Sequence, residues 1–185
     1  EVNGKEWDGN PKIQADKKEH GLKNNEGLQA HCSQRVQELV TKHGKTTIGW
    51  DEVLIPGVPK TVVIQSWRGP ESLAAAAKQG YSGILSNGYY LDLGWTAARH
   101  YAMDPIGGAA ASLAPEEKQR ILGGESCIWS EYVGPENIDS RGWPRNAAIG
   151  ERLGSPESTT DVASVRSRSP YGTIRPHVRT RSSWD

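Results

Sequence analysis

The sequence contains no Phe, one Met and two Cys among its 185 residues. Cys32 and Cys127 can form at most one disulfide bond, and they show no metal-ligand spacing. The sequence therefore points to no metal site and no cofactor. We expect both thiols to be free and buried.

Neither sign of charge prevails, because 22 basic side chains stand against 22 acidic ones. The composition thus gives no whole-chain field that would argue for nucleic acid, a membrane surface or a polyanionic substrate. The longest apolar runs are too short to span a bilayer. The chain starts with polar residues and no Met, so we expect it to be cut from something longer.

Aromatic side chains are present in an unusual selection, with seven Trp and six Tyr. Each of these side chains combines a flat apolar face with a polar edge. This bias is compatible with a wet binding cleft, although ordinary packing in the core and at its rim explains most such residues.

The apolar pattern predicts helices separated by short strands. Residues Leu28, Cys32, Val36, Leu39 and Val40 recur at helical spacing and predict an amphipathic helix over 24–43. Further helices are predicted at Glu71–Gln79, Pro115–Lys118 and Asn137–Leu153, the last with an irregular first turn at Gly142 and Pro144. Strands are predicted at Thr46–Trp50, Thr61–Trp67, Tyr81–Asn87 and Gly123–Trp129.

Strands that alternate with helices, without hairpin signals, predict parallel βαβ units. Every predicted strand ends near Trp, Tyr, Asp or Glu. In a β/α barrel the site is built at the C-terminal ends of the strands, so this placement is typical of a barrel's active face. A length of 185 residues is short for eight units. We therefore predict the α/β class and a partial (β/α)8 TIM barrel.

The residues at the strand ends suggest a carbohydrate pocket. Indole rings pack on the C–H face of a sugar, and carboxylates accept hydrogen bonds from its hydroxyls. A buried Trp beside an ion-paired acid is an equally ordinary structural feature. Asp51 and Glu52 look like a general acid/base pair, but neighbours on a strand point to opposite faces, and an ion pair with Lys60 or Arg68 is the alternative.

The last residues differ in kind from the rest. We divide the chain into a barrel part, residues 1–160, and an atypical Arg/Ser-rich tail, residues 161–185. From Ala163 onward there are five Arg against one acid. A basic arm for phosphate backbones is one interpretation, and a solvated or out-of-place tail is the one we favour.

Five short motifs in a fixed order carry a resemblance to a known family. They are Glu1–Trp7, Gly49–Glu52, Gln65–Gly69, Asn87–Asp92 and Gly124–Glu131. Together they resemble the β-N-acetylhexosaminidases of glycoside hydrolase family 20, and the likeness continues to about Ser155. The family's fourth barrel strand ends in an Asp-Glu pair. The resemblance therefore places Glu1 at its second member and assigns strands five to eight to this chain.

The resemblance implies a hydrolase that removes terminal N-acetylglucosamine or N-acetylgalactosamine from the non-reducing ends of β-linked glycosides, with retention. The sugar's own acetamido oxygen attacks the anomeric carbon and forms an oxazolinium ion. Glu1 matches the general acid that later acts as base. Tyr90 and Asp92 match the residues that hold the acetamido group, Trp50, Trp67 and Trp129 match the indoles around the pocket, and Glu131 matches the acid on the outer hydroxyls. Asp51 and Glu52 match residues that support the pocket.

Some expected residues are missing. The Asp that should precede Glu1 and an Arg of an earlier strand lie outside the sequence, and Gly154 stands where the family usually has Trp. We therefore expect the chain to be inactive alone. The alternative to a hydrolase is a non-catalytic carbohydrate-binding module, and a further alternative is a nucleic-acid-binding protein with a basic tail.

The expected partners are oligosaccharides or glycoconjugates that contain N-acetylhexosamine, with no nucleic acid and no membrane. The resemblance favours an extracytoplasmic location, so that the protein would be secreted, periplasmic or lysosomal. The oligomeric state stays open.

Overall fold

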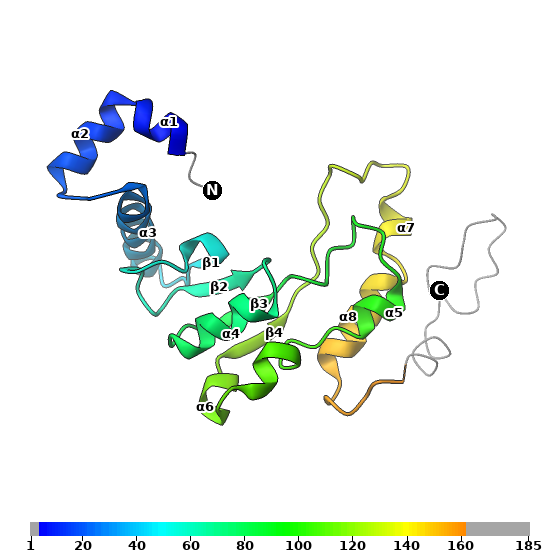
Figure 1. Ribbon diagram of the computed structural model, residues 1–185. Helices are drawn as coiled ribbons and strands as arrows, with labels where there is room; N and C mark the ends of the chain where they lie inside the picture. The colour runs from blue at the N-terminus through cyan, green and yellow to red at the C-terminus, as the bar shows by residue number, and fades with distance from the viewer. Residues whose placement is uncertain (1–3, 162–185) are drawn as a thin grey trace.

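The computed structural model describes residues 4–161 (Figure 1). Glu1, the predicted general acid, lies outside the described residues, as does the predicted tail from residue 162 onward. The division at residues 160 and 161 therefore stays a prediction. No helix in the described part of the chain is long and apolar enough to cross a membrane.

Four parallel strands form one sheet in sequential order, as the alternating pattern predicts. They are β1 (Ile48–Trp50), β2 (Val63–Ser66), β3 (Gly83–Leu85) and β4 (Ile121–Gly124). Ile48 pairs with Val63, and Ile64 pairs with Gly83, which in turn pairs with Ile121. Within residues 4–161, β1 and β4 each pair with one neighbour only, so both outer strands present an open edge.

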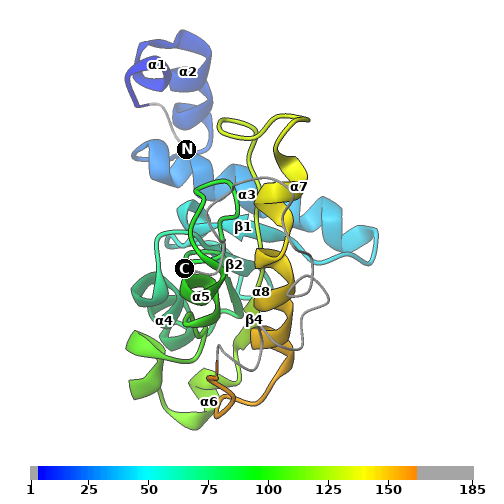
Figure 2. The ribbon, with the colours of Figure 1, turned by 90° about the vertical axis from the view of Figure 1, so that its right-hand side faces the viewer.

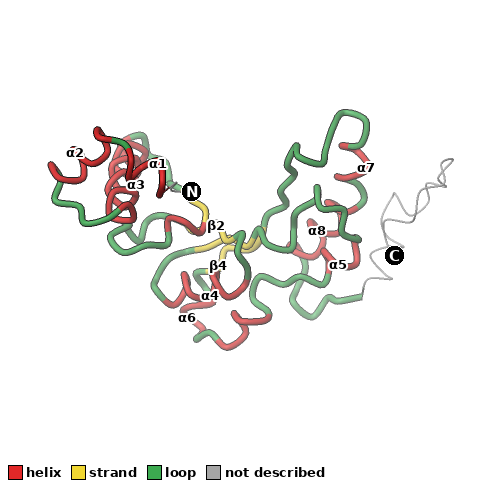
Figure 3. Tube along the Cα trace, turned by 45° about the horizontal axis from the view of Figure 1, so that its top comes forward, coloured by secondary structure: helices red, strands yellow, loops and turns green. Residues whose placement is uncertain are grey.

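Helices flank this sheet on three sides. Figure 1 shows α1 to α3 beyond β1, α4 and α6 beneath the strands, and α5, α7 and α8 on the side of β4. Figure 3 shows the same three groups from another direction, and Figure 2 shows α1 and α2 at the top, apart from the strands. The α-helices are α1 (Gly4–Gly9), α2 (Pro11–Glu19), α3 (Asn25–Lys42), α4 (Pro70–Lys78), α5 (Ala97–Tyr101), α6 (Pro115–Lys118), α7 (Ile138–Gly142) and α8 (Arg145–Gly154). Two 3-10 turns, η1 (Asp51–Val53) and η2 (Gly108–Ser112), complete the described elements.

The main core lies between the strands and α4. Side chains alternate along β3, and Gly83 and Leu85 face the helix layer, where Leu73 of α4 is fully buried. A Cβ on Gly83 would lie 2.5 Å from the Leu73 Cδ1 atom, so the absent side chain lets α4 approach the strand closely. On β2, Ile64 is also fully buried and packs with Ala76 of the same helix.

Two predicted elements end differently in the structure. The fourth strand was predicted at Gly123–Trp129, but β4 covers Ile121–Gly124, because its pairing with β3 begins at Ile121 and the chain then leaves the ladder. Only an isolated bridge between Cys127 and Tyr90 continues the pairing. The predicted closing helix is divided into α7 and α8 on either side of Trp143 and Pro144, in keeping with the irregularity expected there.

The helix α3 confirms the predicted span but not its predicted core face. Asn24 caps it by accepting a hydrogen bond from the Gly27 N–H at 2.8 Å. Cys32, Val36 and Leu39 are exposed, since α3 lies beyond β1, at an open edge of the sheet. Both cysteines are free, as predicted, but neither is fully buried: Cys32 is exposed and Cys127 is half-buried.

Candidate functional site

The C-terminal ends of the four strands bring aromatic and acidic side chains to one edge of the sheet. Trp50 is the last residue of β1, and Trp67 follows β2 directly. Tyr90 lies in the turn after β3, and Trp129 lies in the segment after β4. Because the strands are parallel, these four positions meet at the same edge.

Two adjoining cavities open at this edge. The first has a volume of about 560 Å³ and is lined by Trp50, Glu52, Trp67, Tyr90, Trp129 and Glu131. The second has a volume of about 710 Å³, shares four of these residues, and adds Asp92 together with Arg68, Asn87, Leu93, Trp95 and Tyr132. The structure thus brings all six residues predicted to bind substrate to the walls of these two cavities.

The indole rings form a partly exposed aromatic wall. The rings of Trp50 and Trp129 lie 5.9 Å apart between centroids, at an angle of 47°. Trp67 is 37% exposed and Trp129 is 43% exposed, so both rings offer apolar surface to solvent at the cavity. Such flat apolar surfaces, next to carboxylates, suit a ring that is apolar on its face and polar at its edge.

Asp51 and Glu52 make separate contacts. Of the two interpretations of this pair, an ion pair with Arg68 holds for Glu52, whereas hydrogen bonds hold Asp51. The Asp51 carboxylate is buried and accepts hydrogen bonds from the Arg68 N–H at 2.7 Å and the Ser72 hydroxyl at 2.5 Å. Glu52 faces the cavity, where it accepts a hydrogen bond from the Trp67 Nε1–H at 3.1 Å and pairs with the Arg68 guanidinium at 3.0 Å. Asp51 therefore fastens β1 to the start of α4, and Glu52 orients an indole of the wall.

Asp92 and Tyr90 sit where the segment after β3 meets the segment after β4. Asp92 is 5% exposed, and its carboxylate accepts a hydrogen bond from the Trp129 N–H at 3.3 Å. Burial, with nearby acidic groups, raises the pKa of Tyr90 to about 12. The Tyr90 hydroxyl therefore keeps its proton at neutral pH and can donate a hydrogen bond into the cavity.

A cluster of polar side chains crosses the sheet beside the cavities. No pattern in the sequence predicts a role for it. One Glu125 carboxylate oxygen accepts hydrogen bonds from Gln65, Ser86 and the Cys127 thiol, the last at 3.3 Å. Burial, with the neighbouring Glu125, raises the pKa of Cys127 to about 12. The signal in the sequence was the polar Gln65, which directly follows the apolar run Val63–Ile64 of β2, but no sequence rule predicts its hydrogen-bond partner.

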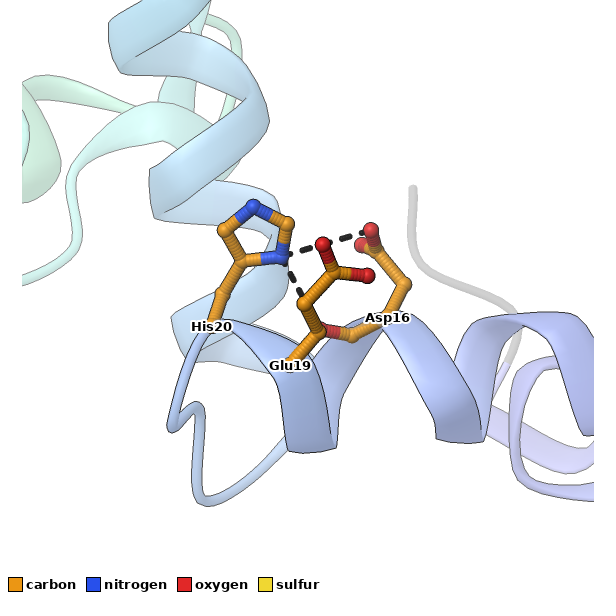
Figure 4. Close-up of side chains that lie close together, drawn as sticks. All are labelled: Asp16, Glu19 and His20. Atoms are coloured by element: carbon orange, nitrogen blue, oxygen red, sulfur yellow. Dashed lines mark hydrogen bonds and ion pairs between the residues drawn. The ribbon is translucent and has the colours of Figure 1, made fainter.

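Among the residues that the structure describes, one group of side chains has ligand atoms close enough to hold a metal ion. Asp16, Glu19 and His20, at the end of α2, have ligand atoms within 4.8 Å of one another (Figure 4). The His20 Nδ1 atom already lies 3.0 Å from the Asp16 carbonyl oxygen of its own helix. The group also lies at the outer end of the α1–α3 arm, away from the strand ends (Figure 1). The arrangement is that of a helix end at which the His20 Nδ1 atom also lies 3.4 Å from an Asp16 carboxylate oxygen.

The family model described as glycosyl hydrolase family 20, catalytic domain, matches residues 1–157. The chain belongs to this family. Its β/α units are part of a barrel, since the solved family 20 structures that it matches are TIM barrels of which the chain covers 26–39%. The assignment of these four strands as the fifth to eighth of a barrel stays a prediction.

Curated proteins similar to this chain include several named "Beta-hexosaminidase subunit beta". The chain is 34% identical to that protein of Felis catus over 175 residues, which covers 88% of this chain and 32% of the relative. It is 35% identical to that of Entamoeba histolytica, with 82% of this chain and 30% of the relative covered. The chain thus spans about a third of the length of the curated relatives that it matches.

Solved structures agree with this membership. A chitobiase of Flavobacterium johnsoniae is 48% identical, with a TM-score of 0.82 over 89% of this chain and 26% of the other. An exo-β-N-acetylglucosaminidase of Vibrio harveyi, solved in complex with N-acetylglucosamine, is 26% identical, with a TM-score of 0.79 over 91% of this chain and 29% of the other.

Proposed function

We propose that the two adjoining cavities bind a terminal N-acetylhexosamine and that the protein hydrolyses its β-glycosidic bond with retention. The observation that carries this proposal is the wall of Trp50, Trp67 and Trp129 around Tyr90 and Glu131, in a chain of family 20. The expected substrates are oligosaccharides or glycoconjugates that end in N-acetylglucosamine or N-acetylgalactosamine.

The chemical roles follow from what each group can do. The acetamido oxygen of the sugar attacks the anomeric carbon while the bond to the leaving oxygen breaks, and Glu1 gives a proton to that oxygen. Water then opens the oxazolinium ion, and Glu1 takes a proton from it. A Tyr90 hydroxyl aimed at the acetamido group would stabilise the charge that develops there, because a fixed donor needs no reorganisation during the reaction.

Asp92 and Glu131 have complementary parts in this proposal. Asp92 would accept a hydrogen bond from the acetamido N–H and, through its bond to the Trp129 N–H, would also fix the position of one indole. Glu131, which is exposed and lines both cavities, would accept hydrogen bonds from the outer hydroxyls of the sugar. Both carboxylates thus bind substrate without acting as nucleophile.

Hydrolysis of 4-nitrophenyl N-acetyl-β-glucosaminide by the full product of the gene tests this function. The Glu1→Gln variant should lose at least ~10²-fold in kcat, at the low end of what general acid–base catalysis contributes, while N-acetylglucosamine still quenches tryptophan fluorescence. Wild-type protein that binds the sugar without hydrolysing the glycoside would favour the carbohydrate-binding module instead. The 185-residue chain, assayed alongside, is expected to release no nitrophenol.

A further inference from the structure

The segment Asn87–Asp92 carries both residues proposed to hold the acetamido group, so its position matters to the proposed reaction. On the side of β4 the backbone is fixed by two hydrogen bonds. The Leu91 N–H donates to the Cys127 carbonyl at 2.8 Å, and the Cys127 N–H donates to the Tyr89 carbonyl at 3.2 Å. The opposite side of the segment is held by α5.

His100 of α5 makes the contact on that side. Its side chain is completely buried, and its Nδ1 atom lies 2.7 Å from the Gly88 carbonyl oxygen. A carbonyl oxygen can only accept a hydrogen bond, so Nδ1 carries the proton and donates it. The Nε2 atom has no partner among the described residues, and the ring packs on Trp95 with centroids 5.9 Å apart.

Burial also lowers the pKa of His100, and the positive charges of Arg145 and Arg99 act in the same direction, against the raising effect of the Gly88 hydrogen bond. The imidazole is therefore neutral at neutral pH, with its one proton on Nδ1. Arg99 and Arg145 are both occupied elsewhere: the Arg99 guanidinium lies over the Trp95 ring, and the Arg145 Nε–H donates to the Trp95 carbonyl.

The backbone at Gly88 takes a conformation and a close approach to Met103 that favour glycine. Gly88 has a φ of +90°, and a Cβ there would lie 2.5 Å from the Met103 Cε atom. The next residue, Tyr89, is completely buried, and its hydroxyl donates to the Met103 carbonyl at 3.2 Å. The side chain of Tyr90 is the first after this anchored pair to reach the cavity.

We infer that His100 is a positioning residue for Tyr90, because its hydrogen bond to the Gly88 carbonyl fixes the backbone from which the Tyr90 hydroxyl reaches the acetamido group. The inference rests on the proposed function for its consequence in catalysis. A displacement of about 1 Å in a group that orients substrate can cost about 10²-fold in rate. His100 itself is not among the described residues that line either cavity.

A double-mutant cycle with the full product of the gene tests this role. His100→Leu should lower kcat for the nitrophenyl substrate by about 10- to 100-fold, as should Tyr90→Phe. If His100 acts through the Tyr90 hydroxyl, adding His100→Leu to the Tyr90→Phe variant should cost less than about threefold more. Losses that simply multiply would overturn the inference, since a general structural role predicts additivity.

Conservative variants of His100 separate the effect of its hydrogen bond to the Gly88 carbonyl from the effect of filling the space of its side chain. The Asn amide nitrogen occupies the place of the imidazole Nδ1, whereas the Gln amide nitrogen extends toward the place of Nε2. His100→Asn should therefore retain kcat within about threefold, and His100→Gln should not. A Gln variant as active as the Asn variant would contradict the inference, even if His100→Leu fails to fold. His43→Leu, at the exposed end of α3, is the matched control.

A measurement without turnover keeps the two proposals apart. With ring-labelled tyrosine, the Tyr90 resonance, assigned through Tyr90→Phe, should shift in His100→Gln and stay in place in His100→Asn and His43→Leu. An unmoved resonance in His100→Gln overturns the positioning role whatever the activity. If the Tyr90 resonance shifts in His100→Gln but the wild-type protein hydrolyses no glycoside, the positioning role is supported and the proposed function is wrong.

Discussion

Replacing Asp51 separates a structural carboxylate from a proton carrier. The Asp51 side chain is 2% exposed and receives three hydrogen bonds, from the Arg68 N–H at 2.7 Å, the Ser72 hydroxyl at 2.5 Å and the Ser66 hydroxyl at 3.4 Å. Ser66 has a better acceptor in the Gly69 carbonyl at 2.9 Å, so only the first two bonds depend on Asp51. These two bonds join the end of β1 to the start of α4.

The expected cost follows from those two bonds. A hydrogen bond to a charged group contributes about 1.5–3 kcal/mol, so the loss of two such bonds in Asp51→Ala should lower the free energy of unfolding by about 3–6 kcal/mol. In Asp51→Asn the amide oxygen can still accept from the Arg68 N–H, and the amide nitrogen can donate to the Ser72 hydroxyl. Two neutral hydrogen bonds then replace two charge-assisted ones, so a loss of about 1–2 kcal/mol is expected.

Urea unfolding of the full product of the gene, followed by tryptophan fluorescence, measures these changes. Asp139→Asn is the control, because Asp139 is exposed, and its change should stay within about 0.5 kcal/mol. The folded Asp51→Asn variant should keep kcat within about tenfold. An Asp51→Asn protein of unchanged stability but with kcat lowered by a factor of ~10⁴ would show that Asp51 transfers a proton and refute the structural argument.

Four further perturbations test other contacts. Gly83→Ala should destabilise the protein by about 1–3 kcal/mol in urea unfolding, since the new Cβ would lie 2.5 Å from the Leu73 Cδ1 atom. Iodoacetamide should alkylate the exposed Cys32 well before Cys127, as read by peptide mass spectrometry, because the raised pKa of Cys127 keeps its thiol protonated. Because the pKa of Cys127 is raised from 9.0 to about 12 in the folded protein, the thiol loses its proton at a lower pH in the unfolded chain. The free energy of unfolding should therefore fall as pH rises from 9 toward 12, and Cys127→Ser should make this fall smaller. Trp129→Ala should weaken N-acetylglucosamine binding by at least about tenfold in fluorescence titration, and unchanged binding would show that the indole wall does not hold the sugar.

The sequence predicted the parts of the fold that depend on local pattern. The apolar run around Ile64 and the alanine-rich segment of α4 gave β2 and its helix to within a few residues, because each element is specified by its own residues. The start of β4 was missed, since its register depends on pairing with β3 and not on its own composition. The short helix α5 was also missed, because five residues are too few to show a helical period.

The site was predictable for a different reason. Residues at the ends of parallel strands must share one edge, so recognising the strands was enough to bring Trp50 and Trp67 together. Trp129 lies beyond the end of β4 at Gly124, and its position in the cavity wall depends on the path of the chain after that strand. Contacts between side chains from different strands could not be predicted in the same way. The Gln65–Glu125 hydrogen bond and the Gly88–His100 hydrogen bond join residues 60 and 12 positions apart, and no periodicity encodes either partner.

In two pairs of consecutive residues, one member belongs to the framework and the other to the cavity. Asp51 and Tyr89 are buried and bind the backbone or side chains behind the strand ends, while their successors Glu52 and Tyr90 line the cavity. Asp51 and Glu52 lie in the 3-10 turn η1, and Tyr89 and Tyr90 lie in the turn after β3, so in each pair a buried residue is followed directly by one that faces the cavity. Changes to the first member of each pair should therefore act mainly on stability, and changes to the second mainly on binding. His100 belongs with the first members, since it acts on the anchored side of the same segment that carries Tyr90.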